Sequence, residues 1–361
     1  MLLLPLIAVA PNRLLPGQGV AVWTALGTGA ALLGLLIVGA GAAAWARGPR
    51  LLPLGLVLAA LVVLLVATGL SATTLLAGRP PSARAMLGAG FWVAFGALGL
   101  LLVEEARSTG RRSSVVVAAV LVGAILLAGT LGAYDRLSLA VEWRARSGAI
   151  AIGLRQHLAL SAAALGLALA VALPLGLAAF RWPRAEAAIG AGLNAVQVVP
   201  AIALFGLLIP VLAALLAWAP ALRSLGIAAI GATPALIGVA VYVALPLTRG
   251  VASGLKAADP AAVEAARAMG MTDTQITREI RLPLGLPILA GALRVAAVQS
   301  IGLMTLGGLI GAGGLGAVVF EGMSQLAADL ILLGALPIVA LALIADAGLA
   351  GLEARLARRR R

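Results

Sequence analysis

Few side chains in this sequence are of types suited to covalent chemistry. The chain of 361 residues has no cysteine and a single histidine, His157. The lack of cysteine excludes disulfides, thiolate zinc sites and cysteine nucleophiles. The spacing of the acidic residues predicts no metal cluster, and no nucleophile is placed beside a base. We therefore expect no catalytic residue, no metal ion and no cofactor in this chain.

One glycine-rich stretch fits the dinucleotide-binding pattern G-x-G-x-x-G, with its glycines at Gly311, Gly313, Gly314 and Gly316. That fingerprint binds a dinucleotide only between a strand and a helix, and here it follows an apolar run of membrane-helix length. We interpret it as a turn that returns the chain to a helix bundle, and as a candidate gate. The only lysine, Lys256, lacks the glycine spacing of a phosphate-binding loop. ATP hydrolysis by that route must therefore belong to another subunit.

The longest polar stretch between apolar runs, residues 249–283, predicts two short capped helices. Asp259 can cap the first helix, and Gly270 is placed to end it in a left-handed conformation. Thr272 and Gln275 have the spacing of a capping box at the start of the second helix. A capped helix pair is a rigid projection, which can transmit force from a cytoplasmic partner.

The elements that carry this projection must be membrane helices. The sequence is 62% hydrophobic and 11% charged, with a mean hydropathy of +1.12, whereas soluble domains carry about 25% charged residues. Its apolar runs are continuous rather than alternating, so they predict helices long enough to cross a bilayer and not barrel strands. We predict nine spans, at 20–45, 52–77, 86–103, 114–133, 155–180, 188–216, 228–248, 285–310 and 330–350.

Basic residues predict the orientation of these spans. With the C-terminus inside, 18 of the 26 arginines and lysines fall on the cytoplasmic side and 8 on the outer side, as the positive-inside rule requires. The net charge of +13 is explained by this distribution, so we expect no nucleic-acid partner. Residues 1–10 are apolar, and we interpret them as the stub of a tenth span. They are a poor signal peptide, because no basic residue precedes them.

The chain divides into three predicted parts. Residues 1–134 hold four extra spans with no readable chemistry, and residues 135–154 form a mixed polar segment that we expect to lie flat on the outer membrane surface. Residues 155–361 hold five spans together with both motifs.

The polar loop resembles the coupling loop of permeases from bacterial binding-protein-dependent importers of the ATP-binding-cassette class. The family pattern is E-A-A, then G, then I-x-L-P, and it is matched at Glu264, Ala265, Ala266, Gly270, Ile280, Leu282 and Pro283. The resemblance implies that these residues form the helix that docks in a groove of the ATPase subunit.

Three stretches of the same part are similar to the osmoprotectant branch of this family, at 155–180, 197–210 and 310–316. The four extra spans and residues 10–14 are similar to the long permease of the Yeh-type osmoprotectant system. The resemblance implies an all-α, polytopic helical bundle with a type I importer core, located in the bacterial inner membrane with a cytoplasmic C-terminus. The implied partners are an ATPase, a binding protein, membrane lipid and a second permease, either an identical copy or a shorter paralogue.

Other functions stay open at the level of sequence. The resemblance implies import of an osmoprotectant such as glycine betaine or a related quaternary ammonium or amino-acid-like solute. Methionine and phosphonate permeases share the coupling loop, so methionine, a phosphonate or another small polar solute is an alternative. An ion-coupled secondary transporter needs internal repeats and charged groups at mid-membrane, and neither is evident. A membrane sensor or scaffold would fit the first four spans alone.

A few polar positions within the spans are secondary candidates. Gln197 and Pro200 are candidate pore residues, because a proline inside a span bends the helix and frees a carbonyl group. We interpret His157 as an interfacial residue and Asp346 as a structural carboxylate that reaches Glu353 and nearby arginines. Glu321 and Asp329 fall in a predicted outer loop, and Trp143, Trp218 and Tyr242 are too few and scattered to predict an aromatic cage for a quaternary ammonium group.

Overall fold

The computed structural model describes residues 4–12, 15–46 and 51–358. It divides into two compact units. The first contains Met1–Arg146 with Gln325–Asp329, and the second contains Ser147–Ser324 with Leu330–Arg361. In the described part of the chain, nine helices are long and apolar enough to cross a membrane. The prediction of nine spans is therefore confirmed in number.

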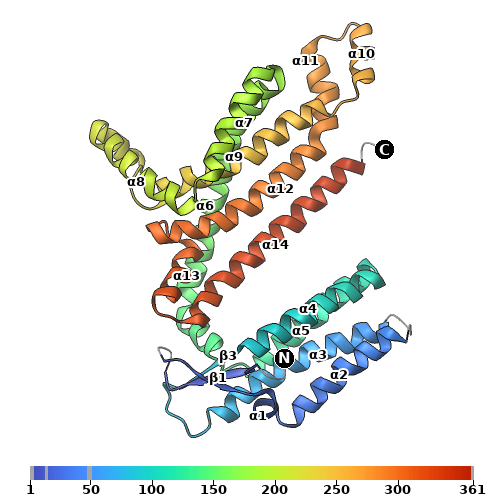
Figure 1. Ribbon diagram of the computed structural model, residues 1–361, viewed down its shortest axis with the longest axis vertical. Coiled ribbons are helices and arrows are strands. Elements are labelled where there is room, and N and C mark those ends of the chain that lie inside the picture. Colours follow the sequence, from blue (N-terminus) through green and yellow to red (C-terminus); the bar gives the residue numbers. More distant parts are fainter. Residues whose placement is uncertain (1–3, 13–14, 47–50, 359–361) are drawn as a thin grey trace. The chain divides into compact units, whose positions relative to one another are not determined.

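The first unit is built around four long helices (Figure 1). These are α2 (Thr28–Trp45), α3 (Leu51–Leu75), α4 (Ala89–Thr109) and α5 (Arg111–Thr130), preceded by the single turn α1 (Val22–Leu26). Helix α3 packs against α2, α4 and α5. The core of the unit combines alanines with large aliphatic and aromatic side chains, among them Leu33, Leu61, Leu64 and Phe91.

A small antiparallel sheet closes one end of this unit, and it corrects two predictions. Strand β1 (Ile7–Ala10) lies between β2 (Gln18–Val20) and β3 (Arg84–Leu87), with Ile7 opposite Val20 and Leu87. The apolar N-terminal run is therefore a central strand and not the stub of a tenth span. The first span likewise starts at Thr28 rather than residue 20, because Gly27, at φ +54°, separates α1 from α2.

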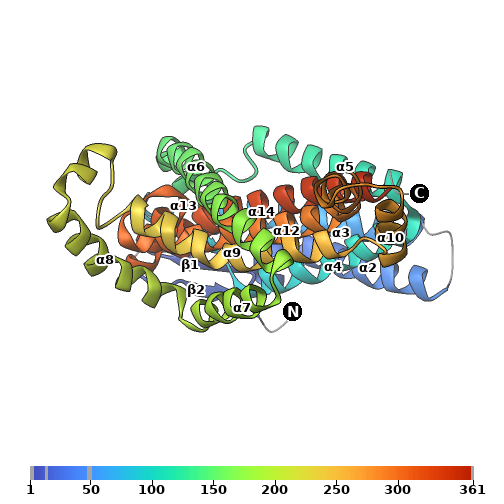
Figure 2. The ribbon, with the colours of Figure 1, turned by 90° about the horizontal axis from the view of Figure 1, so that it is seen from above.

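The second unit contains the remaining long helices. These are α6 (Ser138–Arg181), α7 (Pro183–Val198), α8 (Ala201–Trp218), α9 (Ala232–Lys256), α12 (Leu282–Gly307) and α14 (Ala328–Arg358), of which α6 begins in the first unit. The short elements are η1 (Pro220–Leu225), α10 (Pro260–Ala268), α11 (Asp273–Gln275), the π-helical turn η2 (Ile276–Arg281), η3 (Gly308–Ile310) and α13 (Gly314–Ser324). Helices α9 and α12 form the most extensive pair and lie side by side, with α10 beyond one of their ends (Figures 1 and 2).

Two predicted boundaries in this half are wrong. Residues 135–154 do not form a separate surface segment, because from Ser138 onward they are the first turns of the continuous helix α6. The predicted span 188–216 is two helices, and the chain is extended at Val199 before Pro200 starts α8. The residue before a proline disfavours the helical conformation, so the break lies where the sequence dictates it.

The segment Gln325–Asp329, which overlaps the predicted outer loop, is packed within the first unit. Asp329 is buried and lies in the first turn of α14, where it accepts a hydrogen bond from the Ser138 side chain. Buried Glu142 lies nearby and pairs with Arg146 at 3.6 Å. These polar contacts fix the segment within the first unit.

Candidate functional site

The polar loop folds into a short helical hairpin, and its predicted caps are confirmed. The Asp259 carboxylate accepts a hydrogen bond from the Ala261 N–H at 2.9 Å, at the start of α10. Thr272 and Gln275 form the reciprocal capping box of α11. Gly270 has φ +84°, a conformation that a side chain would strain. Each end of the hairpin is thus set by a local sequence signal.

The motif residues take three different places on this hairpin. Ala266 is buried, and Ile280 packs beside it on a small core that includes Val263 and Ile276. Glu264 and Ala265 are exposed on α10, and Leu282 and Pro283 are exposed at the start of α12. Some residues of the pattern therefore stabilise the hairpin from inside. Others are exposed on its surface, where a partner can contact them.

The sequence motif missed one exposed feature of the hairpin. Met269 ends α10 beside Gly270, and 76% of its surface is exposed. An unbranched, flexible thioether at a projecting tip is suited to filling an apolar pocket on a partner. Its signal in the sequence was an apolar residue directly before a helix-ending glycine.

The hairpin is fixed to the long helices at their ends. The Arg281 guanidinium donates a hydrogen bond to the Leu255 carbonyl at 3.1 Å and lies 5.2 Å above the Phe180 ring. Gly254 of α9 meets Gly285 of α12, and a Cβ atom at Gly285 would overlap the Gly254 backbone. Close backbone packing of this kind joins the hairpin to α9 and α12 with little room for independent motion.

The pore candidate Gln197 fastens α7 to α9. Its side-chain amide donates to the Tyr242 carbonyl at 2.7 Å, and the Tyr242 hydroxyl donates to the Val199 carbonyl just before Pro200. The Val199 carbonyl lies where helix α7 ends, and the Tyr242 carbonyl belongs to α9. The pair therefore supplies hydrogen bonds at the helix break that Pro200 creates, a role that the sequence alone did not predict.

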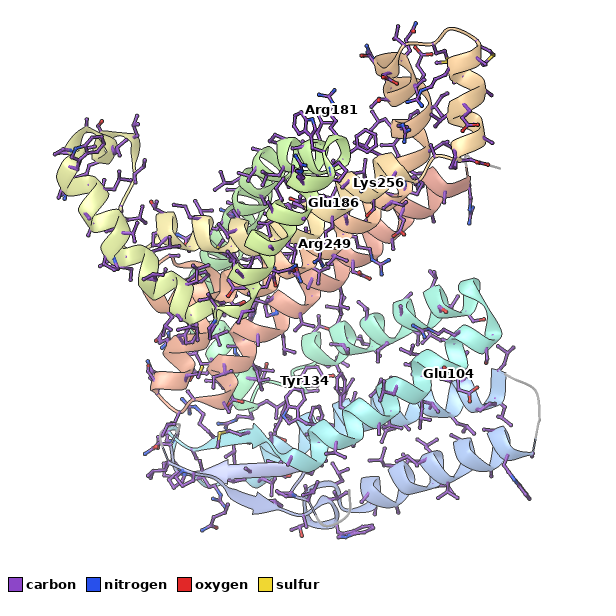
Figure 3. All side chains as sticks on the ribbon, turned by 45° about the horizontal axis from the view of Figure 1, so that its top comes forward. Glu104, Tyr134, Arg181, Glu186, Arg249 and Lys256 are labelled. Atoms are coloured by element: carbon purple, nitrogen blue, oxygen red, sulfur yellow. The ribbon has the colours of Figure 1, made fainter. Side chains whose placement is uncertain are left out.

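Two further polar pairs join α7 to α9. Lys256 pairs with Glu186 at 2.7 Å, and Arg249 donates to the Asn194 side chain at 2.9 Å. Figure 3 shows Glu186, Arg249 and Lys256 along the line where α7 meets α9. On α9 the three positions 242, 249 and 256 recur every seven residues, which places them on one helix face.

The glycine-rich stretch forms the predicted turn, between η3 and α13. Gly311, Gly313 and Gly314 all have positive φ, and the Gly314 N–H donates to the Gln156 side chain at 3.2 Å. A Cβ atom at Gly316 would overlap the Thr305 backbone. The glycines are therefore required both by backbone conformation and by close packing.

His157 is not interfacial, which corrects the prediction. It is fully buried against this turn, and its Nε2 lies 3.0 Å from the Ile301 carbonyl. One turn further along α6, the Ser300 hydroxyl donates to the Ser161 carbonyl at 2.8 Å. Helix α6 is thus held to α12 by buried polar contacts.

Asp346 pairs with an arginine, as predicted. The Arg294 guanidinium contacts the Asp346 carboxylate at 2.6 and 3.2 Å and the Glu353 carboxylate at 3.5 Å. These residues border a cavity of about 470 Å³ that Gln299 also lines. Arg294 lies on α12 and both carboxylates lie on α14, so this ion triad joins the two helices, in agreement with the predicted structural role of Asp346.

Comparison with known families accounts for both parts of the chain. Residues 1–140 match the family described as "ABC transporter permease YehY, N-terminal domain". Residues 164–358 match the family described as "Binding-protein-dependent transport system inner membrane component". The second match contains the hairpin, the glycine turn and the ion triad.

Individual relatives match the same part. The chain is 34% identical over 201 residues to the carnitine transport permease protein OpuCB of Listeria monocytogenes, covering 56% of this chain and 85% of the relative. It is 36% identical over 191 residues to the osmoprotectant import permease protein OsmW of Salmonella typhimurium, covering 53% and 84%. A solved structure of the MetNI methionine ABC transporter in an inward-facing conformation is 23% identical, with a TM-score of 0.51, and the match covers 58% of this chain and 97% of that one. That likeness concerns the fold alone.

Proposed function

Because the chain belongs to the family of binding-protein-dependent transport system inner membrane components, we propose that it forms half of the pathway by which an importer moves an osmoprotectant into the cytoplasm. The chain is a multi-pass permease subunit of a bacterial importer of the ABC class, and such a permease works with an ATPase and a substrate-binding protein. The proposal concerns the solute, the coupling surface, the second permease and the orientation.

The observation that carries the coupling role is the rigid hairpin α10–α11–η2. Its ends are capped, its core is formed by Val263, Ala266 and Ile276, and Arg281 ties it to α9. We place Glu264, Ala265 and Met269 at the contact with the ATPase. Gly270, Ile280, Leu282 and Pro283 shape the hairpin and its junction with α12. Closure of the ATPase dimer then pushes the hairpin, and α9 and α12 move with it as one body.

The solute assignment is supported by relatives that import carnitine and osmoprotectants. We propose glycine betaine or a related quaternary ammonium solute. In our proposal two permeases enclose the pathway, Gln197 and Pro200 shape it at the α7–α8 break, and the glycines at 311, 313, 314 and 316 form its outer gate. The C-terminus and the hairpin lie in the cytoplasm, in agreement with the basic residues that surround them.

The test is uptake of labelled glycine betaine by cells that lack their own betaine transporters. The cells express the ATPase and the binding protein with this permease, without it, or with the variant Gly270→Val. We expect uptake only with the unaltered permease. If the assembled complex takes up no betaine, the solute assignment is wrong, and the binding protein is then screened with methionine and phosphonates.

A reporter fused to the C-terminus tests the orientation. We expect an enzyme that is active only in the cytoplasm to be active there. Activity of a reporter that works only outside the membrane would reverse the proposed topology.

A further inference from the structure

A cavity of about 720 Å³ lies where α6, α9 and the start of α12 converge beside the hairpin. Arg181 ends α6 and Leu255 lies in the last turn of α9, so the cavity lies at the ends of these helices. In the proposed orientation this is the cytoplasmic surface of the membrane, and the inference below rests on that part of the proposed function.

The lining of the cavity is strongly basic. It contains Arg181, Arg267, Arg278 and Arg281, against a single acidic residue, Asp273. Four positive charges and one negative charge leave this lining at +3. An anion is therefore the ligand that the charge of the cavity favours.

The four arginines are not equally engaged. Arg267 pairs with Asp273 at 3.1 Å, and Arg281 is held by the Leu255 carbonyl and the Phe180 ring. Within the described part of the chain, the side chains of Arg181 and Arg278 have no hydrogen-bond or ion-pair partner. Two guanidinium groups are thus available to bind a phosphate in the bidentate geometry that arginine favours.

The same lining also contains apolar side chains. Leu173, Leu177 and Phe180 line the cavity along α6, and Leu282 lines it at the start of α12. A free phosphate or a soluble nucleotide would leave these side chains without a matching surface. A lipid presents both kinds of surface, since its headgroup is anionic and its acyl chain is apolar.

We propose that this cavity binds an anionic phospholipid, with the headgroup phosphate between Arg181 and Arg278 and an acyl chain along the α6 residues. Basic pockets between membrane helices on the cytoplasmic side are suited to such headgroups. The bound lipid would link α6 to η2, the part of the hairpin that leads into α12.

Native mass spectrometry of the purified permease–ATPase complex tests this site with phosphatidylglycerol and phosphatidylcholine as probes. We expect the complex to retain phosphatidylglycerol in preference to phosphatidylcholine. The double variant R181Q/R278Q removes both free guanidinium groups, and we expect it to bind phosphatidylglycerol about 30-fold more weakly. The matched control R184Q/R355Q removes the same charge from exposed positions outside the cavity and should retain the preference. Equal melting temperatures of the two variants exclude misfolding as the cause.

Four results would each overturn the proposal. The two lipids bind equally, or R181Q/R278Q binds as the control does. Inorganic phosphate displaces the lipid at low concentration, which identifies a soluble anion as the ligand. The permease alone binds the lipid but the complex does not, which assigns the cavity to the ATPase interface. Because no solute is transported in this assay, failure of the betaine assignment leaves its outcome interpretable.

Discussion

The two units of the molecule fill their interiors with different kinds of residue. In the first unit large side chains such as Leu61, Leu64 and Phe91 form much of the buried core, with alanines between them. In the second unit α6 presents a stripe of small residues at every fourth position, with Ala164, Ala168 and Ala172 fully buried. The stripe continues to Gly176, where a Cβ atom would lie 2.5 Å from Val251 of α9.

The difference indicates how each unit responds to force. Small residues let helix backbones approach closely in a membrane, and the second unit adds buried polar contacts such as those of His157 and Ser300. Interfaces of this density shift between discrete arrangements and do not deform gradually. A unit that must carry motion from a hairpin through α9 and α12 benefits from such packing.

The largest effect is expected from adding one methyl group where backbones meet in the second unit. Gly285→Ala places its Cβ atom in the Gly254 backbone, so we expect a loss of about 2–3 kcal/mol in stability and a loss of transport. The matched change Gly99→Ala in α4 meets nothing within 4 Å and should stabilise its helix by up to about 1 kcal/mol. Thermal unfolding of the detergent-solubilised protein measures both. Equal behaviour of the two variants would contradict the close backbone approach of α9 and α12.

A second test compares two glycines of the same conformation. Gly270 and Gly78 have φ +84° and +72°, and a Cβ atom would meet nothing within 4 Å of either. Valine at either position should cost about 1–2 kcal/mol of local strain. We expect only Gly270→Val to uncouple ATP hydrolysis from transport, because Gly78 lies in the first unit. ATPase activity and uptake are measured in the same vesicles, and unchanged coupling in Gly270→Val contradicts the proposed role of the hairpin.

Local sequence signals predicted the ends of the hairpin α10–α11–η2, but they did not predict the contacts that hold it to the long helices. Asp259, Gly270 and the Thr272–Gln275 box act within a few residues, so the sequence alone identified them. The Gly254–Gly285 approach joins positions 31 residues apart (285 − 254) and gives no local pattern. The same reason explains why neither the Arg294–Asp346 contact nor the Gln197–Tyr242 contact was predicted as a specific pair.

The prediction of a tenth span at the N-terminus was wrong for a related reason. Residues 1–10 are apolar throughout, and in a membrane protein an apolar run of this kind favours the prediction of a helix. Its partner β3 lies more than 70 residues later and is bound through the backbone, as in the pairing of Ala8 with Met86. Backbone pairing over that distance cannot be inferred from side-chain periodicity.

A smaller effect is expected from the helix caps. Thr272→Ala removes the hydroxyl that accepts a hydrogen bond from the Gln275 N–H. Of the capping box, only the hydrogen bond from the Thr272 N–H to the Gln275 side chain remains. We expect a loss of about 1 kcal/mol, confined to the hairpin and measured as faster hydrogen exchange across α11 and η2. Thr109→Ala in the first unit is the control, since its hydroxyl donates to a helix carbonyl and does not cap a helix start. Faster exchange throughout the second unit would show that the hairpin does not unfold locally.

The smallest effect belongs to the first unit and concerns a hydroxyl group. The Tyr134 ring packs against Gly69 of α3, and its buried hydroxyl has no hydrogen-bond partner in the described part of the chain. Removing an unsatisfied polar group should be neutral or slightly favourable, so we expect Tyr134→Phe to change stability by at most about 1 kcal/mol. Glycine at position 69 is what admits the ring, and Gly69→Ala should therefore be more harmful than the loss of the hydroxyl.

The pH dependence of stability separates this effect from a simple packing change. Burial raises the pKa of the Tyr134 phenol above its usual 10.0, so the folded protein holds this proton more tightly than the unfolded chain does. The resulting contribution is fully present below pH 10.0 and is lost as the pH rises through the folded-state pKa. Melting temperatures measured below and above pH 10.0 should therefore fall less steeply in Tyr134→Phe than in the unaltered protein. If the melting temperatures of the two proteins fall in parallel with pH, the Tyr134 hydroxyl is hydrated. Water would then reach the interior of the first unit in spite of its aliphatic core.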